Sequence, residues 1–136
     1  MADSKTAIPP SHRDLLDAPV ASLATIGPDG RPQQTLVWFL ADGDDVRISL
    51  NTDRQKVENL RADPVIDVLI PDLSNPMRYL EVRGDAEISD DPDYAFAAQV
   101  GRKYDADLRS FDGPGSSRIV VHIRPTRINA VDMSAA

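Results

Sequence analysis

Residues 46–60 read VRISLNTDRQKVENL, and the spacing of the apolar residues changes within this stretch. Apolar and polar residues alternate over residues 46–50, which is typical of a strand with one buried face. Over residues 53–62 the apolar positions follow a helical period, with Val57 three positions before Leu60. The stretch therefore predicts a strand that leads directly into a short helix.

Two signals mark the ends of this predicted helix. Thr52 and Gln55 fit a capping box, in which the Thr52 hydroxyl accepts a hydrogen bond from the Gln55 amide and the Gln55 side chain reaches back. Asp63 is expected to end the helix, because a residue that precedes a proline, here Pro64, avoids the helical conformation. The helix is therefore expected over residues 53–62.

The first turn of this helix carries two cations, Arg54 and Lys56. A helix N-terminus already has a partial positive charge, so two cations there are unfavourable unless an anion is bound. Free backbone amides, the helix dipole and the cations together suit a phosphate group. The spacing alone leaves one alternative open, a solvated helix start in which Asp53 and Glu58 pair with the cations.

The rest of the chain is rich in strand-like segments, which are separated by turn signals such as GPDG at residues 27–30. Residues 65–70 form a near-continuous apolar run, which predicts a strand buried on both faces. Six strands are predicted in total, over residues 20–26, 32–40, 46–50, 65–70, 79–88 and 119–123. Two more helices are expected, over residues 11–17 and from residue 91 onward. Short strands in this number favour a closed or nearly closed antiparallel barrel over an open sheet.

Length, composition and charge limit the class of protein. With 136 residues the chain fits one domain, predicted over residues 11–131, with a flexible arm at 1–10 and a tail at 132–136. The lack of cysteine excludes disulfides and thiolate chemistry, and no histidine–carboxylate spacing indicates a metal site. A formal net charge of −7 disfavours nucleic acid and anionic membranes as partners. No apolar run resembles a signal peptide or approaches the roughly 20 residues of a membrane span, so we expect a cytoplasmic protein.

A second polar cluster lies on one of the predicted strands. Gln33, Gln34 and Thr35 come shortly before Trp38. Amides and a hydroxyl beside an aromatic ring could hold the polar edge of a heteroaromatic ligand. The simpler interpretation, which we favour for the aromatic residues, places Trp38 and its neighbour Phe39 in the core.

No side chain stands out as an acid, a base or a nucleophile. His12 lies near the terminus, and His122 lies in the middle of a predicted strand between Val121 and Ile123. The sequence has neither a glycine-rich dinucleotide loop nor a nucleophile elbow. If the chain is an enzyme, its side chains therefore position a cofactor that supplies the chemistry, and the catalytic residues stay unassigned.

Five segments occur together in an order that is familiar from one protein family. They read ASLAT at residues 21–25, DGRPQ at 29–33, VWF at 37–39, TDRQKVENLRADP at 52–64 and YLEVRGDA at 79–86. Through them the chain resembles the pyridoxamine 5'-phosphate oxidase-like split β-barrel family, and within it the F420-dependent (deazaflavin) oxidoreductases of the B group. The resemblance extends over about residues 10–131. It implies a mainly β (α+β) fold, a six-stranded antiparallel split β-barrel with short flanking helices.

The resemblance also implies a homodimer with two cofactor sites at the subunit interface. Arg54 and Lys56 would hold the cofactor phosphate, and the strand from Gln33 to Val37 would lie along the tricyclic ring. The strand end from Ser49 to Thr52 would also approach the cofactor. The loop from Pro76 to Tyr79, which contains Arg78, would approach it at its oligoglutamate tail. The implied cofactor-binding residues are Gln33, Gln34, Thr35, Val37, Ser49, Thr52, Arg54, Gln55, Lys56, Asn59, Met77 and Arg78.

The implied function is that of an F420H2-dependent reductase, which transfers a hydride from the deazaflavin cofactor to a small conjugated organic substrate. FMN is the alternative cofactor, because the two cofactors use overlapping sites in the family. A non-catalytic F420 carrier or sensor on the same barrel is a third interpretation, and it best explains the missing acid and base residues. Oxidation of vitamin B6 is not expected, because the chain is shorter than true pyridoxamine phosphate oxidases and lacks their C-terminal Arg/His substrate-binding segment.

Overall fold

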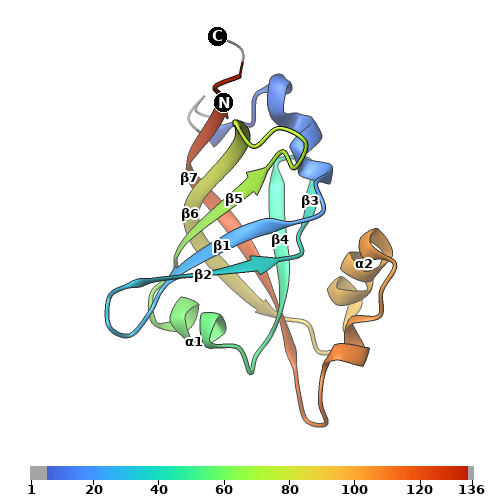
Figure 1. Cartoon of the computed structure of the whole chain (residues 1–136). Coiled ribbons are helices and arrows are strands. Elements are labelled where there is room, and N and C mark those ends of the chain that lie inside the picture. Colours follow the sequence, from blue (N-terminus) through green and yellow to red (C-terminus); the bar gives the residue numbers. More distant parts are fainter. Residues whose placement is uncertain (1–5, 135–136) are drawn as a thin grey trace.

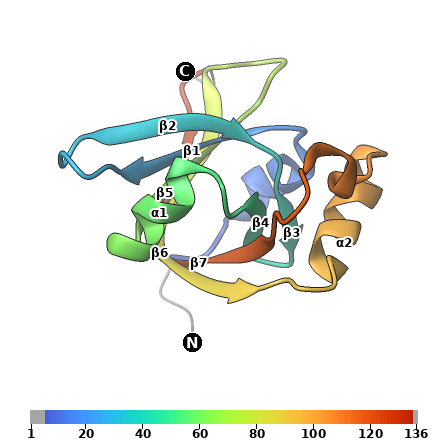
Figure 2. The same cartoon turned by 90° about the horizontal axis from the view of Figure 1, so that it is seen from below.

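Seven strands form a single antiparallel sheet in the computed structural model, which describes residues 6–134 (Figure 1). They are β1 (Ala21–Ile26), β2 (Pro32–Val37), β3 (Leu40–Asp42), β4 (Asp45–Asn51), β5 (Val65–Pro71), β6 (Arg78–Asp90) and β7 (Arg118–Asp132). Across the sheet the order is β2-β1-β5-β6-β7-β4-β3. The sheet curves into a barrel, which Figure 2 shows from below, and the predicted mainly β barrel is confirmed.

The barrel is split between β2 and β4. β3 pairs with β4 only as far as Arg47, so residues 48–51 of β4 have no strand on that side in the described sheet. β2 pairs with β1 alone. Both strands therefore keep an unpaired backbone edge, and residues from both strands line the same cavity.

The sequence predicts six strands, and the structure has one more because the predicted strand of residues 32–40 is divided into β2 and β3. Between them, the backbone of Phe39 is bound by side chains of helix α2 (Ala95–Tyr104) instead of by a strand. The Phe39 N–H donates to the Tyr104 hydroxyl at 3.1 Å, and Lys103 Nζ donates to the Phe39 carbonyl at 2.9 Å. The chain thereby passes from β2, at one edge of the sheet, to β3, at the opposite edge.

β5 and β7 also differ from the prediction. The sequence predicts burial of both faces of β5, but only alternate residues such as Ile66 and Val68 are fully buried, and Asp67 is half-buried. The reason is that no helix of the described chain covers the outer face of β1, β2 and β5 (Figures 1 and 2). The predicted last strand is part of the longer β7, which continues past a register shift opposite Arg83 and Gly84.

The folded part of the chain begins before residue 10, where the sequence predicts the end of a flexible arm. Ile8 belongs to the core and is 3% exposed. The 3-10 helix η2 (Pro10–Asp17) follows, and its His12 is buried and donates Nε2–H to a backbone carbonyl of β7 at 3.0 Å. The first half of the predicted arm and the end of the predicted tail lie outside the described residues.

Helix α1 (Gln55–Ala62) lies on one side of the lower end of β4 (Figure 1). The segment that contains α2 and the 3-10 helix η3 (Leu108–Phe111), called the α2–η3 segment, lies on the other side. The helix η3 folds back against α2 because of Gly101. A Cβ atom at that position would lie 2.3 Å from the Ala106 carbonyl oxygen, so the close approach requires glycine. Within residues 6–134, every helix falls short of the length and apolar character that a membrane span needs.

Candidate cofactor site

A cavity of about 480 Å³ opens at the split of the barrel, between β2, β4, α1 and the α2–η3 segment. Four residues that the sequence singles out line it, namely Val37, Ser49, Arg54 and Lys56. The rest of the lining is Val20, Leu36, Trp38, Leu50, Asn51, Val100, Leu108, Phe111 and Arg118. The cations on the α1 side thus face an apolar and aromatic lining on the α2–η3 side.

Arg54 and Lys56 bring positive charge to the cavity without a carboxylate to balance it. Arg54 is the exposed N-cap residue of α1, and Lys56 Nζ donates to the Thr35 hydroxyl on β2 at 3.1 Å. Within residues 6–134, neither side chain forms an ion pair with a carboxylate. Burial, and then the charge of Arg54, lowers the pKa of Lys56. A bound anion would offset both effects.

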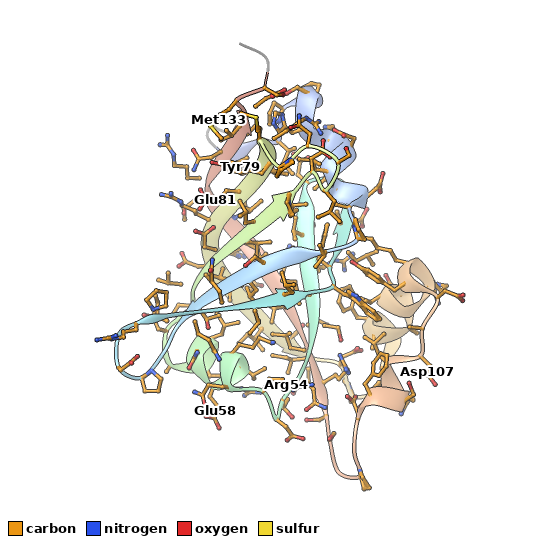
Figure 3. The ribbon with its side chains drawn as sticks, viewed as in Figure 1. Arg54, Glu58, Tyr79, Glu81, Asp107 and Met133 are labelled. Carbon is orange, nitrogen blue, oxygen red and sulfur yellow. The ribbon has the colours of Figure 1, made fainter. Side chains whose placement is uncertain are left out.

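The alternative interpretation, a solvated helix start, requires ion pairs that the described residues do not form. Asp53 accepts a hydrogen bond from the Ser116 hydroxyl at 3.0 Å and is not paired with a cation. Glu58 is exposed and points away from the barrel (Figure 3). Among the described residues, the two cations at the start of α1 therefore have no carboxylate partner.

The predicted capping box at Thr52 and Gln55 is wrong. The Thr52 N–H donates to the Ser117 carbonyl at 2.9 Å, and the hydroxyls of the same two residues lie 2.8 Å apart. Gln55 Nε2 instead donates along the helix to Asn59 Oδ1 at 2.9 Å. Hydrogen bonding to Ser117, the residue before β7, thus overrides the local pattern, and α1 begins at Gln55 without a side-chain cap.

A buried hydrogen-bond network fastens α1 to the sheet. Asn59 Nδ2 donates to Thr25 Oγ1 at 3.1 Å and to Gln33 Oε1 at 2.9 Å. Gln33 and Thr35 lie on the inward face of β2, whereas Gln34 is exposed on the outward face. Gln33 and Asn59 are therefore engaged in positioning α1, and Gln34 lies away from the cavity.

Met77 and Arg78 lie at the opposite end of the barrel from α1. Tyr79, the next residue, is near the top in Figure 3, whereas α1 is near the bottom in Figure 1. The Arg78 guanidinium forms ion pairs with Asp14 and with Asp72, the latter at 3.1 Å. The hydrogen bond with Asp14 is the main cause that raises the pKa of Arg78. Within one chain these residues do not reach the cavity, and the charge of Arg78 is already balanced.

The aromatic side of the cavity does not follow from the sequence. Phe39 is fully buried as predicted, but Trp38 is 36% exposed and lines the cavity, so its predicted place in the core is wrong. Trp38 stacks on Tyr104, with ring centroids 4.3 Å apart and an interplanar angle of 6°. Phe111 meets the indole edge-on at 5.9 Å. For Trp38 the available signal is its place shortly after the polar cluster at Gln33 to Thr35, and for Phe111 it is that the residue is an isolated aromatic in a polar loop.

A buried ion pair holds the loop that carries Phe111. Arg118 donates to both Asp112 oxygens, at 2.8 and 2.9 Å, and Asn51 and the Tyr94 hydroxyl donate to the same carboxylate. Burial acts to raise the pKa of Asp112, but these hydrogen bonds outweigh it and lower the pKa to about 2. The ionised carboxylate thus ties the loop to β4 and β7, and no sequence pattern indicates this pairing.

Comparisons with solved structures find the same fold in other proteins. A structure named F420 Reductase is 38% identical to the chain, over 90% of this chain and 98% of its own, with a TM-score of 0.79. A putative pyridoxamine 5'-phosphate oxidase from Listeria innocua is 26% identical, over 85% and 90%, with a TM-score of 0.65. The conserved hypothetical protein Rv2991 from Mycobacterium tuberculosis shares the fold at 23% identity, over 97% and 89%, with a TM-score of 0.75.

The family comparison covers nearly the whole chain. The family model for pyridoxamine 5'-phosphate oxidase matches residues 8–132. No curated protein matches the sequence. The chain therefore belongs to the pyridoxamine 5'-phosphate oxidase family of split-barrel proteins, which bind a flavin or the deazaflavin F420.

Proposed function

We propose that the chain is a reductase that uses F420H2 to transfer a hydride to a small conjugated organic substrate. The observation that carries this proposal is the pair of cations, Arg54 and Lys56, which line the cavity at the split without a carboxylate partner. The likeness to a solved F420 Reductase, at 38% identity, supports the choice of cofactor.

The residues of the cavity fit a phosphorylated tricyclic cofactor. Arg54 and Lys56 would hold the phosphate by charge-assisted hydrogen bonds, and the unpaired edge of β2 near Val37 would meet the polar edge of the ring. When bound, F420H2 would supply the acceptor with a hydride, which is two electrons and one proton, and its oxidation to F420 would release one further proton to solvent. The described lining contains no carboxylate and no histidine, so the second proton comes from solvent.

FMN is the alternative cofactor, and the position of Arg78 is the reason to retain it. The resemblance places Arg78 near the oligoglutamate tail of F420. In the structure its guanidinium is held by Asp14 and Asp72 at the other end of the barrel. Within one chain, Arg78 therefore gives F420 no advantage over FMN, which has no such tail.

A non-catalytic carrier or sensor of F420 is the second candidate function. The observation in its favour is that the described lining of the cavity contains neither a carboxylate nor a histidine that could transfer a proton. This candidate predicts saturable cofactor binding without oxidation of bound F420H2 by any acceptor, whereas the reductase oxidises its cofactor when a suitable acceptor is added.

We further propose that two copies of the chain form a homodimer with the cofactor sites at their interface. Leu36 supports this, because it is 74% exposed on the outward face of β2, at the edge of the cavity. The neighbouring outward residues on β1 are the small Ser22 and Ala24. An exposed leucine beside small residues, on a face without a helix, suits the close approach of a second copy.

The experiment that tests the cofactor proposal is a titration of the purified protein with F420 and, separately, with FMN. Wild type is compared with Lys56→Ala and with Arg61→Ala, an exposed arginine in the last turn of the same helix that serves as a matched control. Loss of a charge-assisted hydrogen bond costs about 1.5–3 kcal/mol, so we expect Lys56→Ala to weaken binding by about 10- to 150-fold.

The outcomes separate the candidates. Saturable F420 binding that is weakened by Lys56→Ala but not by Arg61→Ala supports the proposed site. Tighter binding of FMN than of F420 would mean that FMN is the cofactor, and the proposed phosphate site would stand. If neither cofactor binds, or if both variants bind as wild type does, the phosphate assignment is wrong.

A further inference from the structure

We propose that the aromatic side of the cavity, formed by Trp38 and Phe111, is the binding site for the electron acceptor, and that the acceptor is a flat, uncharged conjugated ring. This inference rests on the proposed function, because it names the substrate class of the same cavity. It is carried by four features of this side of the cavity, which are the free aromatic surface, the absence of an available charge, the position beside the proposed cofactor ring and the rigid support behind the surface.

The first feature is aromatic surface that the fold leaves free. One face of the Trp38 indole is covered by the Tyr104 ring, which does not itself line the cavity. Trp38 is 36% exposed, and Phe111, which meets it edge-on, is 60% exposed. Two large rings that contact each other and remain open to a cavity offer a surface on which another ring can stack.

The second feature is the charge of this side. The neighbouring lining residues are Val20, Val100 and Leu108, which are apolar. The adjacent cation, Arg118, donates hydrogen bonds to both oxygens of Asp112 and to the Ser49 hydroxyl. Its charge is therefore already balanced. A charged group placed here would lose its hydration without gaining a partner, which favours an uncharged ligand.

The third feature distinguishes the acceptor from the cofactor. The two cations that would anchor the cofactor phosphate belong to the α1 side, across the cavity from η3. The cofactor ring would then lie along β2 as far as Val37. Trp38 directly follows Val37 in the chain, so the aromatic surface adjoins the proposed ring position without coinciding with it.

The aromatic surface is also held in a fixed position before any ligand binds. The loop that ends η3 is tied down by the Asp112–Arg118 ion pair, and η3 is seated against α2 through Gly101. A preformed surface loses little conformational entropy when a ring stacks on it.

The test uses the fact that Trp38 is the only tryptophan in the chain, so its emission reports on this surface directly. Wild type is titrated with naphthoquinone, as an uncharged flat ring, and with naphthoquinone sulfonate, both in excess inorganic phosphate, which competes with the sulfonate for Arg54 and Lys56 in the same cavity. Phe111→Ala is compared with Leu73→Ala, a residue of similar exposure (63%) in the β5–β6 loop. F420 affinity is measured for all three proteins from the anisotropy of the cofactor's own fluorescence.

We expect saturable quenching of Trp38 by naphthoquinone and clearly weaker binding of the sulfonate. We expect Phe111→Ala to raise the Kd of naphthoquinone by about 3- to 10-fold, as the loss of one aromatic contact implies, and Leu73→Ala to leave it unchanged. F420 affinity should be the same in all three proteins.

Three results would overturn the inference. They are quenching that does not saturate, equal binding of the sulfonate, and a loss of F420 affinity in Phe111→Ala, which would assign the aromatic surface to the cofactor. Failure of the proposed function gives a different pattern, in which naphthoquinone saturates at Trp38 while F420 does not bind to wild type at all.

Discussion

Asp112 and Arg118 hold each other through two parallel hydrogen bonds, at 2.8 and 2.9 Å, and their side chains are only 4% and 9% exposed. Asp112→Asn keeps the shape of the side chain but leaves the Arg118 charge buried without a counter-ion. Breaking a buried pair in this way costs about 3–5 kcal/mol of unfolding free energy. Urea denaturation measures the loss, and Asp93→Asn, at an exposed aspartate just before α2, is the control. A loss below about 1 kcal/mol would mean that the pair does not hold the loop.

Asp67 makes the stability of the protein depend on pH. It lies on the outward side of β5 beside Glu81, and burial, followed by the hydrogen bond with Glu81, raises the pKa of Asp67 to about 7. The folded chain therefore binds this proton more tightly than the unfolded chain does. The stability that the protonated Asp67 contributes is complete below the ordinary pKa of an aspartate and is lost as the pH rises through about 7.

Asp67→Asn removes this dependence. After allowance for the partial exposure of the side chain, we expect the variant to be about 1–2 kcal/mol more stable than wild type at about pH 8. At about pH 4 the difference should be much smaller. Urea denaturation at the two pH values measures it, with the exposed Asp85→Asn as the control. A gain of the same size at both pH values would show that Asp67 does not titrate in this range.

Asn59 is expected to affect the cofactor site without touching the cofactor. Asn59→Ala leaves Gln33 and the Thr25 hydroxyl without their donor, which costs about 1–3 kcal/mol of unfolding free energy. Because α1 carries Arg54 and Lys56, its looser attachment should also lower the affinity for F420 or FMN. Denaturation and cofactor titration are compared with Glu58→Ala on the exposed side of the same helix. Lost stability with unchanged affinity would separate α1 from the phosphate site.

Leu36→Glu tests the proposed homodimer. A charged side chain on this exposed position would be desolvated at an interface between two copies, so we expect the variant to sediment as a monomer where wild type sediments as a dimer. Leu73→Glu places the same charge on an exposed leucine of the β5–β6 loop and should leave the dimer intact. The proposal fails if wild type is a monomer, or if Leu36→Glu remains a dimer.

Local periodicity is what made the barrel predictable from the sequence. Alternation over residues 46–50 indicates a half-buried strand whatever its partner, and β4 lies there. The two cations at the start of α1 conflict with the helix dipole, and this conflict marked the cavity. These signals depend on neighbours in the chain, so they can be read without the structure.

The parts that the sequence does not predict depend on partners far along the chain. β3 separates from β2 because Tyr104 and Lys103 bind the backbone of Phe39. The pattern of a capping box at Thr52 fails because Ser117 binds that residue instead. In both cases a long-range hydrogen bond replaces the local one, and residue spacing carries no information about it.

The split between β2 and β4 also bears on how the protein avoids aggregation through its strand edges. An exposed strand edge can recruit strands from other molecules and so begin aggregation. Here the unpaired backbone of β2 and the unpaired part of β4 border the same cavity rather than forming separate outer rims. A ligand that fills this cavity also shields both edges, so loading with cofactor would make the protein less prone to aggregate as well as competent to react.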